Sequence, residues 1–130
     1  MVIAMKKDCI IPPGSEPSLC YSPAIRYGDT IYVAGQVGED ASGYIPADIE
    51  GQTELAIQNA RKLLEAAGSS LDQVLMCQCF LRREADFSGM NAAYAKFFGG
   101  EHNTAPARYT IIAPPVDEKY LVEIAMIAGV

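Results

Sequence analysis

The C-terminal stretch, residues 120–128, constrains the fold of this chain more than any other segment. Its β-branched and apolar residues predict a strand, in which successive side chains point to opposite faces. Apolar side chains then stand on both faces of the strand: Leu121, Ala125 and Ile127 on one, and Tyr120, Val122, Ile124 and Met126 on the other. The fold therefore has to cover both faces of this strand.

Four more strands are predicted from short runs of β-branched, aromatic and apolar residues bounded by Gly, Pro or Asp. They are residues 21–27, 30–35, 74–82 and 107–113. The first two are separated by Gly28-Asp29, which predicts a hairpin. The last of the four ends at Pro114-Pro115, and proline disfavours continued strand pairing.

Two amphipathic helices are predicted from apolar residues at helical spacing. The first begins after Asp48, a favourable N-cap, and Gly68 stands where a left-handed cap would end it. The second follows Asp86 and stops at Gly99-Gly100. Its aromatic residues recur along one face, which is typical of a side packed in the core.

The element order β-β-α-β-α-β-β favours a two-layer α+β domain with both helices on one face of a mixed sheet. Two helices cannot also cover the opposite face of the sheet. Since a large apolar sheet face is rarely left in water, we expect another copy of this protein to cover it. The sequence thus predicts a homo-oligomer.

Length and charge limit the number of domains, the partners and the cellular location to be expected of this chain. The chain has 130 residues, 50% hydrophobic and 20% charged, which predicts a single domain over residues 1–130. A net charge of −6 without a long basic run makes nucleic acid and anionic membranes unsuitable partners. No apolar stretch approaches the roughly 18 residues that span a bilayer, and the N-terminus lacks a signal-peptide pattern, so a cytoplasmic location is expected.

The four cysteines, Cys9, Cys20, Cys77 and Cys79, are expected to be free and buried thiols. Cys77 and Cys79 would share one face of a strand side by side, a poor arrangement for a disulfide. A zinc site would need more ligands than His102, the single histidine, can add, so no metal is expected. His102 lies in a predicted loop, where a solvated side chain is commoner than an acid/base catalyst.

Glu123 is the one charged residue of the apolar strand at 120–128. A carboxylate buried there without a partner would cost several kcal/mol. Arg108 stands at the head of the strand 107–113, and a guanidinium can bind a carboxylate through two parallel hydrogen bonds. If these two strands are neighbours, the side chains could approach each other. They would form a structural ion pair or a cleft for a small anionic substrate, and the residues leave both open.

Three other polar or aromatic residues are weaker candidates. Gln78 lies in an apolar strand, where it could bond backbone groups at a subunit interface. Tyr21 could offer its hydroxyl to a ligand or simply expose it to water. Asn91, among apolar positions of the second helix, could cap a loop or point into a site. The sequence contains no Ser-His-Asp order, Walker loop or dinucleotide fingerprint.

Five motifs occur in order along the chain: Tyr32-Val33-Ala34-Gly35-Gln36, Leu64-Glu65-Ala66-Ala67-Gly68, Met90-Asn91-Ala92-Ala93-Tyr94-Ala95-Lys96-Phe97-Phe98, Pro106-Ala107-Arg108 and Val122-Glu123-Ile124. Over nearly the whole chain they resemble the RidA (YjgF/UK-type) family of reactive enamine/imine deaminases. The resemblance implies a chorismate-mutase-like fold, with a six-stranded mixed sheet and two helices on one face. It also implies a trimer with a central barrel and clefts between subunits.

The resemblance implies hydrolysis of 2-aminoacrylate and related 2-imino acids to 2-keto acids and ammonia, with no cofactor. Arg108 would hold the substrate carboxylate, and Glu123 would orient and activate the attacking water. Tyr21 would line the cleft, and Gly35 and Asn91 would shape it.

The chain departs from the family pattern at three places. Ala34 stands where a Ser is usual, Thr110 where a Cys is usual, and Leu19-Cys20 where a Gly-Pro precedes the tyrosine. The backbone carbonyl of Thr110 is still implied to accept a hydrogen bond from the imine nitrogen. Substrate identity stays open, including larger enamines such as 2-aminomuconate.

Two other functions compete with deamination. A non-catalytic module could bind a small carboxylate or a partner protein at the same place. The resemblance also implies a third function, because members of this family have been described as endoribonucleases or translation inhibitors. The acidic net charge and the lack of a basic face disfavour RNA as a substrate of this chain.

Overall fold

The structure is a computed structural model and describes residues 5–18, 20–99 and 104–130. Its strands and α-helices follow in the order β1 (Lys7–Ile10), β2 (Ala24–Tyr27), β3 (Thr30–Val37), α1 (Ile49–Ala66), β4 (Val74–Leu81), α2 (Phe87–Phe98), β5 (Ala107–Ile112) and β6 (Val122–Gly129). Two short 3-10 helices, η1 (Leu71–Gln73) and η2 (Glu84–Asp86), precede β4 and α2 among the described residues.

The predicted hairpin, helices and later strands are all present within a few residues of their expected bounds. The predicted element order contains five strands and misses β1, the edge strand that brings the sheet to six. Three of its four residues are exposed, and Lys7 and Asp8 interrupt the apolar pattern. A short, polar edge strand carries little periodicity for a sequence to reveal.

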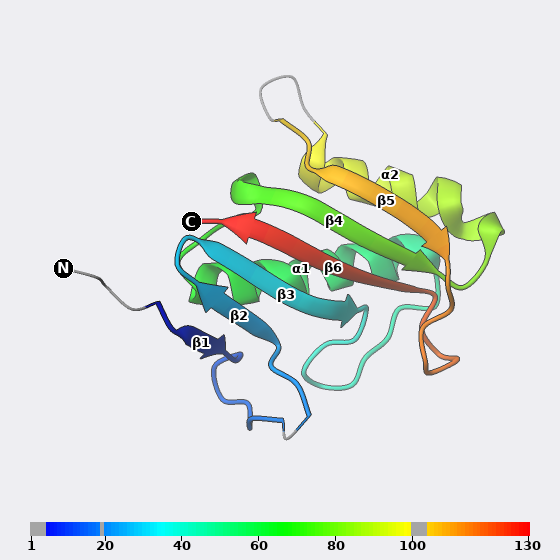
Figure 1. The fold of residues 1–130 in the computed structure, drawn as a ribbon. Coiled ribbons are helices and arrows are strands. Elements are labelled where there is room, and N and C mark those ends of the chain that lie inside the picture. The colour runs from blue at the N-terminus through cyan, green and yellow to red at the C-terminus, as the bar shows by residue number, and fades with distance from the viewer. Residues whose placement is uncertain (1–4, 19, 100–103) are drawn as a thin grey trace.

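The described strands form one mixed sheet in the order β1-β2-β3-β6-β4-β5. All neighbours pair antiparallel except β4 and β5, which run parallel. β6 lies inside the sheet between β3 and β4, which explains why its residues are apolar on both faces. Figure 1 shows α1 and α2 on the same face of this sheet, as predicted.

The caps predicted for α1 are present. The side chain of Asp48 accepts a hydrogen bond from the backbone N–H of Gly51 at 3.2 Å. After the helix, Gly68 adopts a φ of +87°, and the N–H of Ser69 donates to the carbonyl of Leu64 at 2.8 Å. A left-handed glycine with such a bond satisfies carbonyls that the helix end leaves open.

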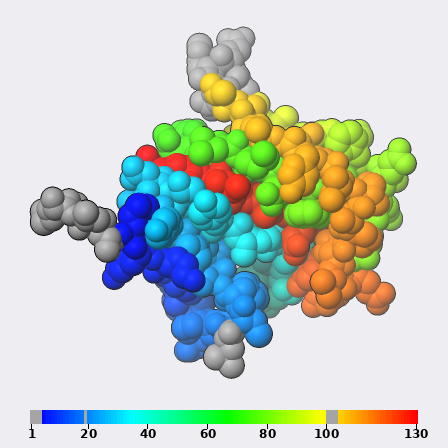
Figure 2. Space-filling model, in the orientation of Figure 1, coloured from blue at the N-terminus to red at the C-terminus, as the bar shows by residue number. Residues whose placement is uncertain are grey.

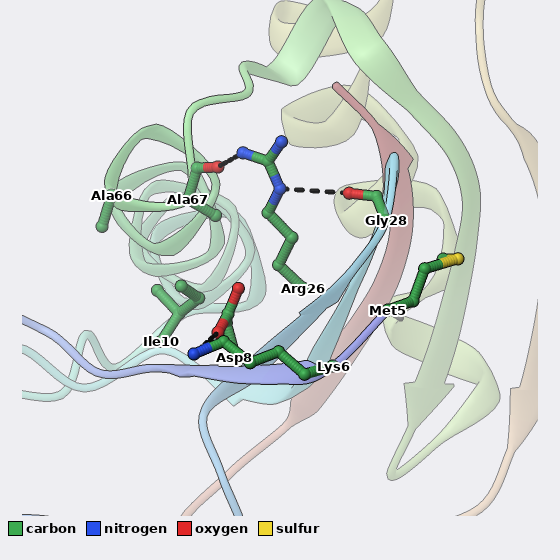
Figure 3. Close-up of a pocket in the computed structure, with 8 residues that line it drawn as sticks. All are labelled: Met5, Lys6, Asp8, Ile10, Arg26, Gly28, Ala66 and Ala67. Carbon is green, nitrogen blue, oxygen red and sulfur yellow. Dashed lines mark hydrogen bonds and ion pairs between the residues drawn. The ribbon is translucent and has the colours of Figure 1, made fainter. Parts of the chain in front are cut away.

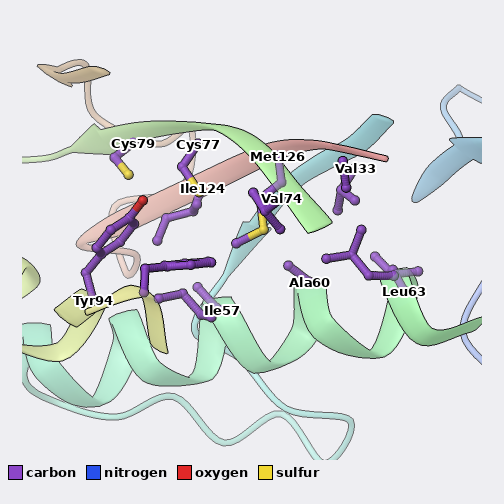
Figure 4. Packing of buried hydrophobic residues seen from close by; sticks show 14 of the residues in the cluster. Val33, Ile57, Ala60, Leu63, Val74, Cys77, Cys79, Tyr94, Ile124 and Met126 are labelled. Atoms are coloured by element: carbon purple, nitrogen blue, oxygen red, sulfur yellow. The ribbon is translucent and has the colours of Figure 1, made fainter. Parts of the chain in front are cut away.

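The core lies between the sheet and the helices. Figure 4 shows buried side chains of the sheet facing those of α1: Val33, Ile124 and Met126 from the sheet, and Ile57, Ala60 and Leu63 from the helix. Cys77 and Cys79 are fully buried in this core, as expected. The expectation of buried thiols is wrong for Cys9 and Cys20, which are exposed, because Cys9 lies in the edge strand and Cys20 in the segment before β2.

The face of the sheet opposite the helices is apolar and largely exposed. We call it the open face; it carries Ile25, Tyr32, Met76, Gln78, Phe80, Tyr109, Ile111, Ala125 and Ile127. Tyr32, Tyr109 and Ile111 are 51%, 44% and 45% exposed. Figure 2 looks onto this face, where β3, β6, β4 and β5 lie side by side. An apolar surface of this kind is typical of an interface.

No helix in the described part of the chain has the length and apolar character needed to cross a membrane.

Candidate functional site

Arg108 and Glu123 lie on opposite faces of the sheet. Their strands are not neighbours, because β4 lies between them. Arg108 pairs with Cys77 of β4, whereas Glu123 pairs with Phe80. Since Cys77 and Phe80 are three residues apart in one strand, their side chains point to opposite faces. The predicted approach of the two charged groups therefore does not occur within one chain.

Arg108 stands on the helix-covered side of the edge strand β5 and is half-buried. Its guanidinium carbon lies 4.7 Å from the centre of the Tyr94 ring, a cation–π contact. None of the described acidic side chains forms a salt bridge with it. The guanidinium is thus held by an aromatic ring and not by an opposite charge.

The groups around Arg108 are neutral at ordinary pH. Burial raises the pKa of the Cys77 thiol to about 11 and that of the Cys79 thiol to about 12. Burial also raises the pKa of the Tyr94 phenol. The thiols and the phenol stay protonated, so they leave the positive charge of Arg108 uncompensated.

Two buried hydroxyl groups near Arg108 lack hydrogen-bond partners in the described residues, those of Tyr94 and Thr110. Thr110 follows Arg108 by two residues and shares its face of β5. The thiols of Cys77 and Cys79 face these hydroxyls and are only weak hydrogen-bond partners. A cation beside unsatisfied hydroxyls is chemically suited to an anionic ligand with several oxygen atoms.

Glu123 is half-buried on the open face, where it packs against Gly35. A Cβ atom at position 35 would lie 2.7 Å from Cδ and 2.9 Å from Oε2 of Glu123. The register between β3 and β6 shifts between Val33 and Gln36, which places Gly35 in an irregular part of the strand pair. Glycine at this position leaves the space that the carboxylate occupies.

Tyr21 and Gly35 line one cavity, with a volume of about 240 Å³, beside the end of β3. Tyr21 is 66% exposed, so most of its ring faces solvent in a single chain. The side chain of Asn59 on α1 donates to the carbonyls of Val37 and Glu39 at 3.0 and 2.9 Å, and it holds the chain on the far side of this cavity. Gly35 thus lies against Glu123 and also lines the cavity of Tyr21, but Glu123 itself is not among the residues that line this cavity.

The other candidate residues are Asn91, Gln78 and His102. Asn91 lies one helical turn before Tyr94 on α2, on the same side of that helix, and is half-buried. Gln78 is half-buried on the open face. His102 lies outside the described residues. Arg108, Thr110 and Asn91 therefore belong to one end of the β5–α2 region, separate from Tyr21, Gly35 and Glu123.

Sequence reasoning missed two residues that support these groups. Tyr94 was expected only as a core aromatic, since helical spacing alone does not show that its ring lies under a cation. Arg82 was not singled out, although it donates to the carbonyls of Pro115, Asp117 and Tyr120 at 2.8, 2.7 and 2.8 Å. A basic residue after a strand gives no signal that its partners lie more than thirty positions away.

A larger cavity lies at another place in the molecule. Figure 3 shows this hollow of about 520 Å³ between β1 and the end of α1. Within it, Arg26 donates to the carbonyls of Ala67 and Gly28 at 2.9 and 3.1 Å. Because Arg26 satisfies the C-terminal end of α1, its role there is structural. None of the predicted site residues lines this cavity.

Comparison with known sequences identifies relatives over nearly the whole chain. Residues 14–130 match the family described as Endoribonuclease L-PSP. A RutC family protein of Saccharolobus solfataricus is 35% identical over 126 residues, which cover 95% of this chain and 98% of that protein. A RutC family protein of Pyrococcus horikoshii is 33% identical over the same shares of both chains.

Solved structures agree with this assignment. The Rid family protein YyfA of Yersinia pestis has a TM-score of 0.85 and 30% identity, over 96% of this chain and 100% of that chain. The YjgF gene product of E. coli has a TM-score of 0.84 and 26% identity, over 94% and 98%. E. coli TdcF, solved with bound serine, has a TM-score of 0.85 and 25% identity, over 95% and 98%. This chain therefore belongs to the Rid/YjgF/L-PSP (RutC) family and has its chorismate-mutase-like α+β fold.

Proposed function

We propose that this protein hydrolyses a reactive enamine or imine of a small amino acid, such as 2-aminoacrylate or a 2-imino acid, to the 2-keto acid and ammonia. The observation that carries the proposal is the uncompensated charge of Arg108, which faces neutral groups and unsatisfied hydroxyls. Such a guanidinium can bind the carboxylate that these substrates share. Family membership supports it, as does the serine bound to TdcF, which is a small amino acid with the same carboxylate.

The catalytic site in this proposal is formed by two copies of the chain. Arg108 and Glu123 lie on opposite faces of one sheet, so a single chain cannot bring both to one small substrate. Arg108 stands on the edge strand β5, where it can reach a neighbouring molecule, and Glu123 stands on the open face that a neighbour would cover. We therefore propose a homotrimer with clefts between subunits, the assembly of this family.

The chemistry follows from these two groups. Arg108 of one copy binds the carboxylate, and the backbone carbonyl of Thr110 accepts a hydrogen bond from the imine N–H. Glu123 of the neighbouring copy takes a proton from water as the water oxygen bonds to the imine carbon, and it passes this proton to the nitrogen, which gives a neutral carbinolamine. The carboxylate next takes the hydroxyl proton of the carbinolamine. Glu123 then returns its proton to the amine, the carbon–nitrogen bond breaks, and ammonia leaves as the carbonyl forms.

The remaining candidates shape the cleft in this proposal. Tyr21 and Gly35 form the wall beside Glu123, and Asn91 lies near the carboxylate end. An enamine substrate first gains a proton on carbon and loses one from nitrogen, and so becomes the imine that water attacks. No cofactor takes part in these steps, because the substrate carries its own electrophilic carbon.

A trapping assay tests the proposal. A pyridoxal-phosphate-dependent dehydratase generates 2-aminoacrylate from serine, and semicarbazide traps the resulting imine in a form measured by absorbance. We expect wild-type protein to lower the rate of semicarbazone formation by competing for the imine. We expect Arg108→Ala to abolish this effect, and Glu123→Gln to reduce the deamination rate by about 10² to 10⁴-fold, the usual contribution of general acid–base catalysis.

The matched variant Arg108→Lys keeps the charge but loses the two-pronged geometry, so it should retain only part of the activity. Wild-type protein that leaves semicarbazone formation unchanged would contradict the proposal, as would full activity of Arg108→Ala. Saturable binding of pyruvate without turnover would favour a binding module instead. RNA cleavage that survives both Arg108→Ala and Glu123→Ala would favour a nuclease.

A further inference from the structure

The guanidinium of Arg108 is supported by one ring. Its central carbon lies over Tyr94, 4.7 Å from the ring centre. Tyr94 is 8% exposed, and its ring packs against Phe98 of the same helix with 4.7 Å between ring centres. Figure 4 shows Tyr94 rising from α2 toward Cys77 and Cys79 of the sheet. The ring is therefore a fixed part of the core, whereas the arginine side chain is half-buried at the edge.

Tyr94 is the one aromatic ring on which the Arg108 guanidinium lies among the described residues. The Arg108 side chain makes no ion pair there, although arginine has many rotamers to lose when it binds a ligand. A binding group that is already oriented loses less conformational freedom on binding, which increases affinity. The contact with Tyr94 can supply that orientation before the ligand arrives.

An aromatic ring can hold the arginine side chain and still leave its guanidinium N–H groups available to a ligand. An acidic neighbour would occupy guanidinium N–H groups and neutralise the charge, whereas an aromatic face attracts the cation from above the plane. The Arg108 side chain donates no hydrogen bond among the described residues, so its N–H groups stay available to a carboxylate. The phenol hydroxyl points toward the Cys77 thiol, a weak hydrogen-bond partner, whereas the face of the ring contacts the guanidinium.

We propose that Tyr94 is a positioning residue, whose ring holds Arg108 with its N–H donors free to bind the substrate carboxylate. This inference rests on the proposed function of Arg108, and nothing in the proposed chemistry requires Tyr94 to touch the substrate. In this proposal Tyr94, a buried residue of α2, affects the affinity of the protein for its substrate.

Kinetics of three variants test the inference. We expect Tyr94→Leu to raise KM for the imine by about tenfold while kcat changes by less than about twofold, since a cation–π contact of a partly buried pair is removed. Tyr94→Phe keeps the ring and should restore a wild-type KM. Val74→Ala is the control, because it shortens a buried side chain of the same core that lies away from Tyr94 (Figure 4).

Binding of pyruvate to each variant, measured by calorimetry, should follow the same order as KM. Thermal unfolding confirms that each variant is folded, and Tyr94→Met, which keeps more side-chain volume, replaces Tyr94→Leu if the latter does not fold. A KM unchanged in a folded Tyr94→Leu or Tyr94→Met protein would overturn the inference.

Two further results would also overturn it. An equal rise of KM in Val74→Ala would show a general effect of the core, and an equal rise in Tyr94→Phe would assign the effect to the hydroxyl. If Arg108→Ala removes activity while the Tyr94 variants do not change KM, only this inference fails. If Arg108→Ala is fully active, the proposed function itself fails.

Discussion

Gly35 contributes to the candidate site through the side chain that it lacks. The Cβ of any other residue would lie within 3 Å of three atoms of Glu123. Real Cβ atoms do not approach their neighbours so closely, so either the carboxylate or the strand would have to move. The position of the candidate general base is therefore linked to a glycine on the adjacent strand.

Gly35→Ala tests this link. We expect deaminase activity to fall by about tenfold or more, because a displacement of about 1 Å in a reacting group can lower rates by orders of magnitude. Binding of pyruvate to Arg108 should change little. Gly129→Ala, also on the sheet, is the matched control, since its Cβ would meet only the carbonyl of Asp29 at 3.9 Å. Equal activity of Gly35→Ala and wild type would show that Glu123 does not need its present position.

At the scale of elements, the connection between β5 and β6 is held from two sides. Arg82, at the end of β4, donates to three of its backbone carbonyls. Gln52 of α1, 2% exposed, accepts from the N–H of Leu121 at 2.8 Å and donates to the carbonyl of Pro46 at 2.9 Å. These bonds fix the chain two residues before Glu123, so they determine where β6 begins.

Arg82→Ala should lower the free energy of unfolding by about 2 kcal/mol, because three carbonyls lose a charged donor at once. Denaturation in urea measures the change. Arg61→Ala is the control, since Arg61 is also half-buried but makes no side-chain hydrogen bond in the described residues, and its effect should stay within about 0.5 kcal/mol. Equal effects of the two substitutions would mean that the three bonds contribute little.

At the scale of the whole molecule, the open face and the separation of Arg108 from Glu123 point to the same requirement. The open face is apolar and exposed in a single chain, and the proposed chemistry needs two copies to bring the two charged groups to one substrate. One assembly can satisfy both. A site of this kind should exist only in the oligomer.

Mixed oligomers test this directly. Arg108→Ala and Glu123→Ala subunits, each inactive alone, are co-expressed with different tags and purified together. Purification through both tags selects trimers that contain both mutants, and in each of them one site of the three combines an intact Arg108 with an intact Glu123 from the next subunit, so about a third of wild-type activity should return. Two differently tagged Arg108→Ala subunits form the control and should stay inactive. A mixture of the two mutants without activity would contradict a site shared between copies.

By itself, the sequence determined the identity and order of most elements. The helix between Asp48 and Gly68 and the hairpin at Gly28-Asp29 depend on local spacing, caps and turns, and all were predicted correctly. The apolar character of both faces of β6 likewise predicted that one sheet face is left uncovered. Glu123 also stood out, because a charge in such a strand is visible from its neighbours in the chain.

Only the tertiary structure decided which strands are neighbours and where the side chains point. Strand order depends on contacts between distant segments, and the insertion of β4 between β5 and β6 cannot be read from either strand alone. Because side chains alternate along a strand, a register difference of one residue transfers a side chain to the other face. For that reason the sequence revealed both Arg108 and Glu123, but the fold placed them on opposite sides of the sheet.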